Sequence, residues 1–197
     1  MSRPSPPYRR ALTAVVVGTL LLLSAGLTAE QNFFKRIVGK DTNVKYQTFR
    51  DPGGRFEIEY PEKDWKRLPS GGSSLAVFAR NDGPTLIIEH VTLEGPLTAK
   101  EMEGMSSVEL SSLKDGQPKA KDFKSDMMES KAGRGVIIRY SRDGAGPETV
   151  LQYTIAVGVD LFRINGVIPD KQLIKSEPIV MYMLQSFKAP AVSTSKH

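Results

Sequence analysis

The chain has 197 residues, of which 40% are hydrophobic and 25% charged, a composition typical of a globular domain and not of a disordered chain. The formal net charge is +5, but residues 51–187 carry 17 basic and 20 acidic side chains, so the excess of positive charge lies outside them, mostly in residues 1–50. Because nucleic-acid binding needs clustered Lys and Arg on the folded surface, we exclude nucleic acid as a partner. The absence of cysteine excludes disulfides, thiolate metal sites and cysteine nucleophiles.

The chain opens with a segment typical of export. Three arginines precede an uncharged run at residues 11–29, which is the order of regions in a signal peptide. Cleavage after Gly26 is permitted. Left uncleaved, these 19 residues span about 28 Å as a helix, close to the hydrocarbon thickness of a bilayer. Residues 1–29 are therefore predicted to be a signal peptide or a membrane anchor, and both place the body on the periplasmic or extracellular side.

Strand patterns follow a predicted linker at residues 30–43. In the segment "RFEIEY", Phe56, Ile58 and Tyr60 alternate with charged residues, which is the period of a half-buried strand. The segment "NDGP" is a hairpin signal between two further apolar runs. Before residue 94 the sequence therefore predicts four strands, at residues 44–50, 55–60, 74–80 and 85–93.

The period then changes to that of a helix. Thr98 followed by Glu101 is a capping box, which predicts the start of a helix. Met102 and Met105 lie on the apolar face of this helix, and Gly116 ends it. A helix at this point interrupts the series of strands.

The second half of the body returns to strands and closes with a helix. In the last helix, Ser176 is the predicted N-cap and Pro178 lies in the first turn; its apolar stripe comprises Ile179, Met183, Leu184 and Phe187. Strands are predicted at residues 121–128, 135–142, 148–159 and 161–168. Short hairpin links make the sheet largely antiparallel, so the predicted fold class is α+β. Residues 189–197 are predicted to be a disordered tail.

The predicted strand at residues 55–60 also carries a resemblance to a known family. A strand of the form F-x-I-x-Y-P followed shortly by Trp resembles the start of the PsbP-like domain, which occurs in the extrinsic P protein of photosystem II and in DcrB-like bacterial envelope proteins. The residues that carry the resemblance, including the end of the last helix, are Phe56, Ile58, Tyr60, Pro61, Trp65 and Phe187. The resemblance covers residues 44–188 and implies an α/β/α sandwich. It also implies binding or scaffolding, with no cofactor or metal ligand set.

Trp65 is the chain's one tryptophan and has two interpretations. In the first, its ring closes one end of the sheet as part of the core. In the second, Trp65 with Tyr60 and Pro61 forms a binding patch, because tryptophan is enriched at interface hot spots. We favour the core interpretation and keep the patch as the candidate binding site.

Other residue types with catalytic potential lack the partners that such chemistry needs. His90 stands alone in a strand, without the further ligands of a zinc site or the acid of a triad. Ser111 and Lys114 match S-x-x-K, but the companion motifs S-D-N and K-T-G do not occur. Glu57 and Glu59 share a strand face, which suits an acid pair or a hard cation, although solvated charged faces are far commoner. We predict no catalytic residue and no metal site.

The sequence therefore favours a non-enzymatic accessory or binding protein of the cell envelope, acting by protein–protein recognition on an unidentified envelope protein. The membrane is reached through the N-terminal segment. Two alternatives from other classes remain: a carrier of a small apolar ligand between sheet and helix, and a hydrolase on the same scaffold.

Overall fold

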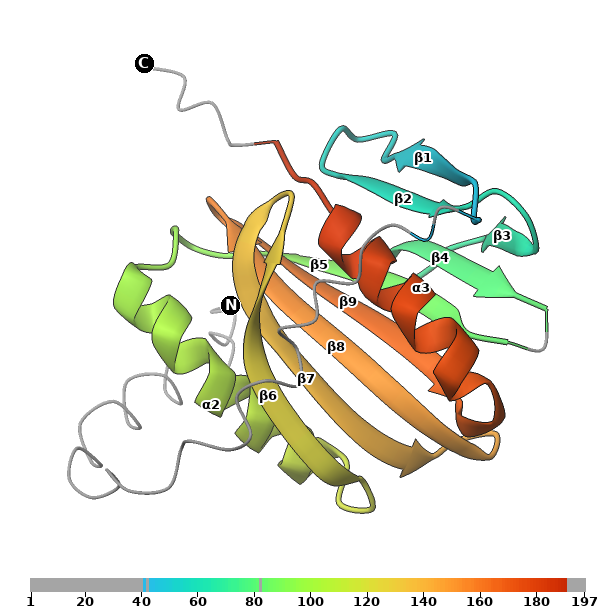
Figure 1. The fold of residues 1–197 in the computed structure, drawn as a ribbon. Helices are drawn as coiled ribbons and strands as arrows, with labels where there is room; N and C mark the ends of the chain where they lie inside the picture. Colours follow the sequence, from blue (N-terminus) through green and yellow to red (C-terminus); the bar gives the residue numbers. More distant parts are fainter. Residues whose placement is uncertain (1–40, 42, 82, 191–197) are drawn as a thin grey trace, which may run out of the picture. The chain divides into compact units, whose positions relative to one another are not determined.

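Figure 1 shows the computed structural model of the chain, which describes residues 41, 43–81 and 83–190. The predicted N-terminal hydrophobic helix at residues 1–29, the linker up to residue 40 and the tail from residue 191 lie outside these residues. The elements in chain order are β1 (Tyr46–Arg50), β2 (Glu57–Pro61), β3 (Trp65–Leu68), β4 (Ser74–Arg80), β5 (Thr85–Thr92), α2 (Ala99–Gly116), β6 (Lys121–Ser130), β7 (Gly133–Asp143), β8 (Pro147–Val157), β9 (Asp160–Pro169), a 3-10 turn (Asp170–Gln172) and α3 (Leu173–Ser186).

Seven of these strands form one antiparallel sheet in the order β3-β4-β5-β9-β8-β7-β6. Strand β9 lies between β5 and β8. Strands β3, β4 and β5 therefore join the meander of β6, β7, β8 and β9 through the pairing of β5 with β9. The predicted α+β class with a largely antiparallel sheet is confirmed. One strand, β3, was not predicted, because only one of its four residues is buried and its pattern does not alternate.

The two helices pack on opposite faces of this sheet (Figure 1). Gly166 of β9 lies under Val180 of α3, whereas Arg163, of opposite parity in the same strand, donates to Glu109 of α2. Successive residues of a strand point to opposite faces, so these contacts assign one face to each helix. The predicted α/β/α sandwich is confirmed.

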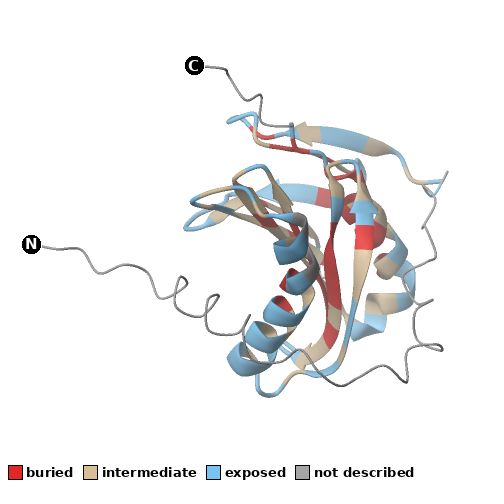
Figure 2. Cartoon of the chain, turned by 90° about the vertical axis from the view of Figure 1, so that its left-hand side faces the viewer, coloured by how far each residue is buried: buried red, intermediate tan, exposed pale blue. Residues whose placement is uncertain are grey.

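α2 begins as the sequence predicts. The Thr98 hydroxyl accepts from the Glu101 backbone N–H at 3.2 Å, and the Glu101 carboxylate accepts from the Thr98 N–H at 2.8 Å, so the capping box is complete. Met105 is buried against β7 and β8, with Met102 and Leu110 packed beside it. The outer side of α2 is exposed (Figure 2), as expected of an amphipathic helix on a sheet.

α3 begins earlier than predicted. Its N-cap is Gln172, so Ser176 is a buried residue inside the helix and not its cap, and Pro178 lies beyond the first turn. The buried stripe therefore includes Val180, with the predicted Ile179 only half-buried. Across the described residues, neither helix combines the length and hydropathy needed to span a bilayer.

β1 and β2 form a separate two-stranded sheet. One face of this hairpin meets the large sheet, where the ring of Phe49 lies 5.4 Å from that of Phe78. Strand β2 of the hairpin is bridged by Lys188, which exchanges two backbone hydrogen bonds with Glu57, at 2.7 and 2.9 Å. The hairpin is thus held by the central sheet and by the last described residues of the chain.

Close packing of α3 on the sheet depends on Gly166. A Cβ atom built on Gly166 would lie 2.4 Å from Cγ1 of Val180, far inside van der Waals contact. Val180 is fully buried, so it has no solvent-filled space into which to move. The absence of a side chain at residue 166 allows the helix to approach the sheet to its observed distance.

Candidate functional site

The structure brings the predicted binding residues together at the junction of hairpin and sheet. Pro61 ends β2 and is buried, and Trp65 opens β3 with only 5% of its surface exposed. Tyr60 is half-buried, with its ring 4.8 Å from that of Phe78. These positions agree with the core interpretation of Trp65. A role in partner binding for the three residues remains a prediction.

The other residues of the family pattern lie in the core beneath α3. The rings of Phe56 and Phe187 stack at 5.6 Å, and Phe162 contacts both rings, at 6.2 and 5.1 Å. Ile58 is completely buried. The pattern F-x-I-x-Y-P is therefore a packing signature: it joins the hairpin to the end of the last helix.

His90 and the acid pair have structural partners. His90 Nε2 lies 2.8 Å from Asp160 Oδ1, with the imidazole ring against Phe162. Arg50 forms an ion pair with Glu57 at 3.2 Å, and Lys131 one with Glu59. Within the described residues, no three His, Asp or Glu side chains lie close enough to hold a metal ion.

Glu59 also receives a hydrogen bond of 2.6 Å from the hydroxyl of Tyr182 in α3. Burial and this bond raise the pKa of the Tyr182 hydroxyl above its ordinary value. Burial, with the nearby negative charge of Asp41, raises the pKa of Tyr46 to about 12, and the two tyrosine rings lie 4.4 Å apart. Both tyrosines therefore stay protonated at neutral pH, and this cluster fastens the hairpin to α3.

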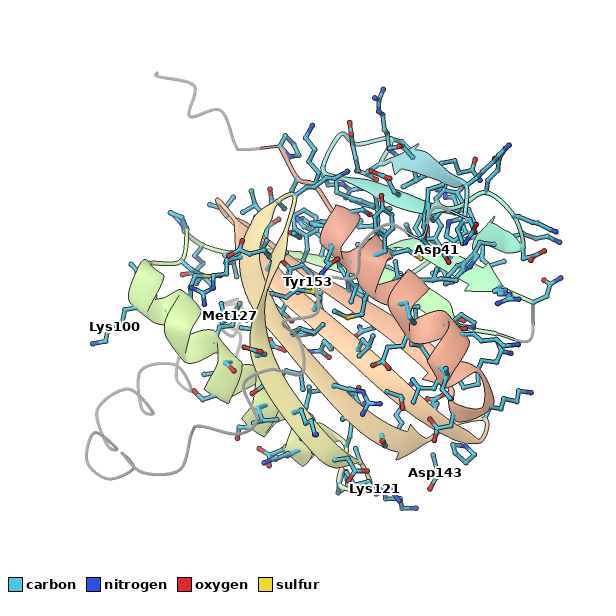
Figure 3. All side chains as sticks on the ribbon, viewed as in Figure 1. Asp41, Lys100, Lys121, Met127, Asp143 and Tyr153 are labelled. Carbon is cyan, nitrogen blue, oxygen red and sulfur yellow. The ribbon has the colours of Figure 1, made fainter. Side chains whose placement is uncertain are left out.

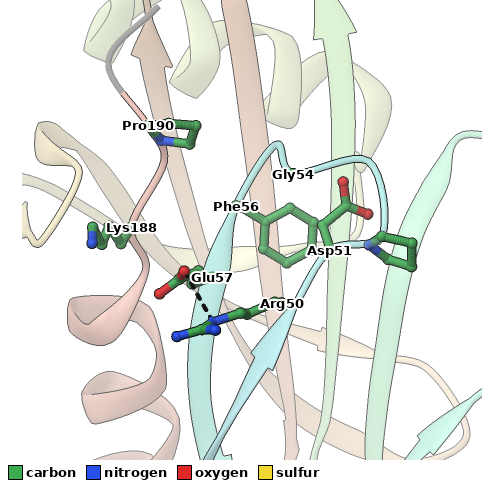
Figure 4. A pocket seen from close by; sticks show the side chains of 8 residues that line it. Arg50, Asp51, Gly54, Phe56, Glu57, Lys188 and Pro190 are labelled. Carbon is green, nitrogen blue, oxygen red and sulfur yellow. Dashed lines mark ion pairs between the residues drawn. The ribbon is translucent and has the colours of Figure 1, made fainter.

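A shallow cleft of about 270 Å³ opens beside the β1–β2 loop (Figure 4). Phe56 forms part of its lining but is 1% exposed, and the cleft is bordered by charged side chains, among them Arg50 and Lys188. On its rim, Asp51 accepts two hydrogen bonds from the Arg55 guanidinium, at 2.7 and 3.0 Å, which hold the pKa of Asp51 below its usual range. This cleft is open to solvent, whereas a carrier of small apolar ligands needs a closed pocket.

A second partly apolar surface lies on the α2 side of the sheet. Register places Leu68, Val77 and Ile87 side by side on β3, β4 and β5, with Val91 further along β5. Leu68 is 41% and Val91 55% exposed, whereas Val77 and Ile87 are half-buried. α2 packs on β6 and β7 and α3 on the opposite face, so in the described part of the chain no helix covers these four residues, which we name the open strip.

Polar groups separate Leu68, Val77 and Ile87 from the core under α2, whereas Val91 lies opposite Leu161, which packs against that core. Glu109 is buried and accepts hydrogen bonds from Gln152 at 2.8 Å and from Arg163 at 2.9 Å. Asn165, opposite Ile87, donates to Glu89 at 3.4 Å, and Glu89 lies on the same face of β5 between Ile87 and Val91 of the strip. Apolar surface beside polar groups that hydrogen-bond to one another within the protein is typical of a protein interface. Without β3, the sequence pattern could not reveal this strip.

Comparisons with known proteins identify the fold. A scan against models of protein families gives no match, and a search of curated proteins gives none either. Among solved structures, the PsbP protein CyanoP of Synechocystis sp. PCC 6803 matches with a TM-score of 0.58 at 13% identity, over 77% of this chain and 96% of that protein.

Two further structures match. LpqN, which is involved in cell envelope biogenesis of Mycobacterium tuberculosis, matches with a TM-score of 0.51 at 15% identity, over 76% of this chain and 94% of LpqN. A Bacteroides thetaiotaomicron VPI-5482 protein matches with a TM-score of 0.54 at 16% identity, over 73% of this chain but only 48% of its own length, so this chain spans about half of that protein. At these identities the likeness shows the fold, and the expectation drawn from the pattern at Phe56–Trp65 is confirmed: this chain has the PsbP-like fold.

Proposed function

We propose that this chain is a non-enzymatic binding protein of the cell envelope, which recognises a partner protein through the open strip. The observation that carries the proposal is the exposure of Leu68 and Val91 on a sheet whose other strands are covered on that face. Exposed apolar surface of this kind costs free energy in water and is usually covered by a binding partner.

The dimensions of the strip favour an amphipathic helix as its occupant. Three neighbouring strands are about 10 Å wide, which is the diameter of one helix with its side chains. α2 already occupies the equivalent place over the far half of the same face, so a second helix would continue an existing layer. Lys66, exposed beside the strip on β3, favours an acidic side chain at the edge of that helix.

Export agrees with this proposal. The signal peptide or anchor predicted at residues 1–29 would deliver the domain to the envelope, and a protein of the same fold, LpqN, takes part in envelope biogenesis. The intact mass of the protein purified from its own cells distinguishes a cleaved signal from a retained anchor.

Site-specific photo-crosslinking in cells tests the proposed surface. A photoreactive residue replaces Leu68 or Val91 in the full chain, and Ile174 is the control position, since it is 92% exposed on α3, on the other side of the sheet. We expect one envelope protein to be crosslinked from both strip positions and not from residue 174. Absence of an adduct at the strip, or the same adducts from residue 174, would contradict the proposal.

Val91→Glu adds a second readout. The carboxylate would have to be desolvated on binding, so we expect the adduct formed from residue 68 to be lost. The matched change Ile174→Glu should leave that adduct unchanged. Retention of the adduct in the Val91→Glu protein would also contradict the proposal.

A further inference from the structure

Two charged side chains of opposite sign share the face of the sheet on which the open strip lies. Glu89 is on β5, between Ile87 and Val91, and alternate residues of a strand point to the same face. Lys66 is on β3, two residues before Leu68. A partner that covers the strip therefore meets one carboxylate and one ammonium group among the apolar side chains.

The charge of Glu89 has no cation paired with it in the described part of the chain. Its carboxylate accepts a long hydrogen bond of 3.4 Å from Asn165. Arg163 lies opposite Glu89 in the register of β5 and β9, but its guanidinium donates to Glu109 of α2 at 2.9 Å. None of the ion pairs between described residues includes Glu89. Two carboxylates and one guanidinium leave this group of side chains with an excess of negative charge.

Binding of a helix would bury this excess charge. Glu89 is half-buried and still in contact with solvent, and a helix that lies over Ile87 and Val91 would displace the water around it. A carboxylate that loses its water without gaining a cation costs free energy. A basic side chain of the partner offsets that cost, and a partner without one is rejected.

Lys66 is the positive counterpart at the other end of the strip. It is exposed, and no Asp or Glu among the described residues forms an ion pair with it. The register sets Lys66 opposite Ala79 and Ala79 opposite Thr85, so Glu89 lies two strands across and four residues along the sheet. These steps are about 10 Å across the strands and about 13 Å along them, which gives a separation of about 16 Å.

The line between these two charges fits the axis of an α-helix. Val77 lies at the midpoint of this line, with Leu68 and Ile87 on either side in the same row. A helix rises about 16 Å in 11 residues, and residues i and i+11 lie on nearly the same face because three turns take about 11 residues. One helix can therefore place apolar side chains on these three residues and a charged side chain over each end of the line.

We propose, as an extension of the proposed function and resting on it, that the partner helix carries a basic residue opposite Glu89 and an acidic residue opposite Lys66, about 11 residues apart. The apolar contacts hold the helix on the strip, and the two charge pairs fix its direction. A reversed helix would place like charges opposite each other at both ends, which is repulsive. Glu89 is thus a residue that determines which helix binds.

Photo-crosslinking from residue 68 of the full chain in cells tests this role of Glu89. We expect Glu89→Lys to lower the yield of the adduct by about tenfold or more, because like charges across an interface repel. Glu89→Gln keeps the size of the side chain and removes its charge, so its yield should lie between those of the unmodified and Glu89→Lys chains. Fluorescence of the buried Trp65 in the purified variants reports whether they fold, and Glu89→Gln is decisive if Glu89→Lys does not.

Glu129→Lys is the matched control. It changes the formal charge by the same amount on the same side of the sheet, but on β6, at the edge opposite to β3. Glu129 lies two residues after Met127, which packs under α2 (Figure 3), and its side chain is 73% exposed. The yield of the adduct should be unchanged. An equal loss in Glu129→Lys and Glu89→Lys would overturn the proposal, because it would show an effect of net charge alone.

Mass spectrometry of the adduct identifies the crosslinked helix. We expect Lys or Arg on the side that faces the strip, with Asp or Glu about 11 residues away, and replacement of this basic residue by Glu should restore the adduct of the Glu89→Lys chain. An adduct undiminished by Glu89→Lys, or a crosslinked segment without a basic residue, would overturn the proposal and leave the open strip as an interface. Absence of an adduct from the unmodified chain, or adducts with lipid alone, would overturn the proposed function as well.

Discussion

Packing of α3 on the sheet makes a quantitative prediction for Gly166→Ala. The new Cβ would lie 2.4 Å from Cγ1 of Val180, while its next neighbours are 3.7 Å away, so Val180 alone accounts for the clash. Overpacking in a filled core costs about 1 to 3 kcal/mol, offset by a few tenths for the lower backbone entropy of alanine in the unfolded chain. We expect the free energy of unfolding to fall by about 2 kcal/mol.

The double variant Gly166→Ala/Val180→Ala isolates this contact. Val180→Ala alone should cost about 2 kcal/mol by leaving a cavity, but it removes the atom that clashes with the new Cβ. The loss of stability in the double variant should therefore be smaller than the sum of the two single losses by about 1 kcal/mol or more.

Urea unfolding of the full chain in mild detergent measures these values. Fluorescence of Trp65, the chain's one tryptophan, reports unfolding because this residue is buried. Gly95→Ala is the control, since nothing lies within 4 Å of its added Cβ, and its stability should be unchanged. Additivity of the two core substitutions would refute the reasoning, as would a Gly166→Ala protein as stable as the Gly95→Ala control.

Two further predictions concern polar contacts. Hydrogen bonds from Arg55 lower the pKa of Asp51 in the folded state. The ionised Asp51 carboxylate therefore stabilises the fold fully at pH values above its unfolded-state pKa. This stabilisation is lost as the pH falls through the lower folded-state pKa. Asp51→Asn should therefore be destabilising in urea unfolding at pH 7, and the difference from the unmodified chain should shrink towards pH 3; a constant difference would contradict this assignment. The buried hydroxyl of Tyr153 donates to Ser130 at 3.0 Å or to the Gly133 carbonyl at 3.1 Å. Tyr153→Phe should cost about 1 kcal/mol in the same assay, and unchanged stability would show that the hydroxyl does not need these partners.

Much of the fold follows from local patterns in the sequence. Residues 74–80 alternate between buried and half-buried side chains, and the observed β4 has the predicted bounds. The capping box of Thr98 and Glu101 fixes the start of α2 because it acts within one turn. Both signals are complete within a few residues.

The errors arise where distant contacts decide the structure. Ser176 has the side chain of an N-cap, but it is a buried residue inside α3, which begins at Leu173 directly after the 3-10 turn. The separation of β1 and β2 from the large sheet depends on Lys188 and on packing against Phe78. Sequence periodicity carries no information about such pairs.

In the candidate site, too, local patterns predict some features and distant contacts decide others. Burial of Trp65 could be predicted, because it follows shortly after a half-buried strand in a pattern that resembles the PsbP-like domain. The open strip could not, because it exists only when the register aligns Leu68 of the unpredicted β3 with Val77 and Ile87. Exposed apolar surface is a property of the assembled sheet, whereas a buried side chain leaves a pattern in its own strand.

The bridge between Glu57 and Lys188 has a consequence for the order of folding. β1 and β2 are synthesised first among the described strands, yet their bonding edge is completed by Ser186 and Lys188, close to the end of the chain. Contacts between residues so far apart in sequence form late and slowly. A nascent chain that has not reached residue 188 therefore carries an incomplete hairpin, and the domain acquires its full stability only after residues 186–188 have been added.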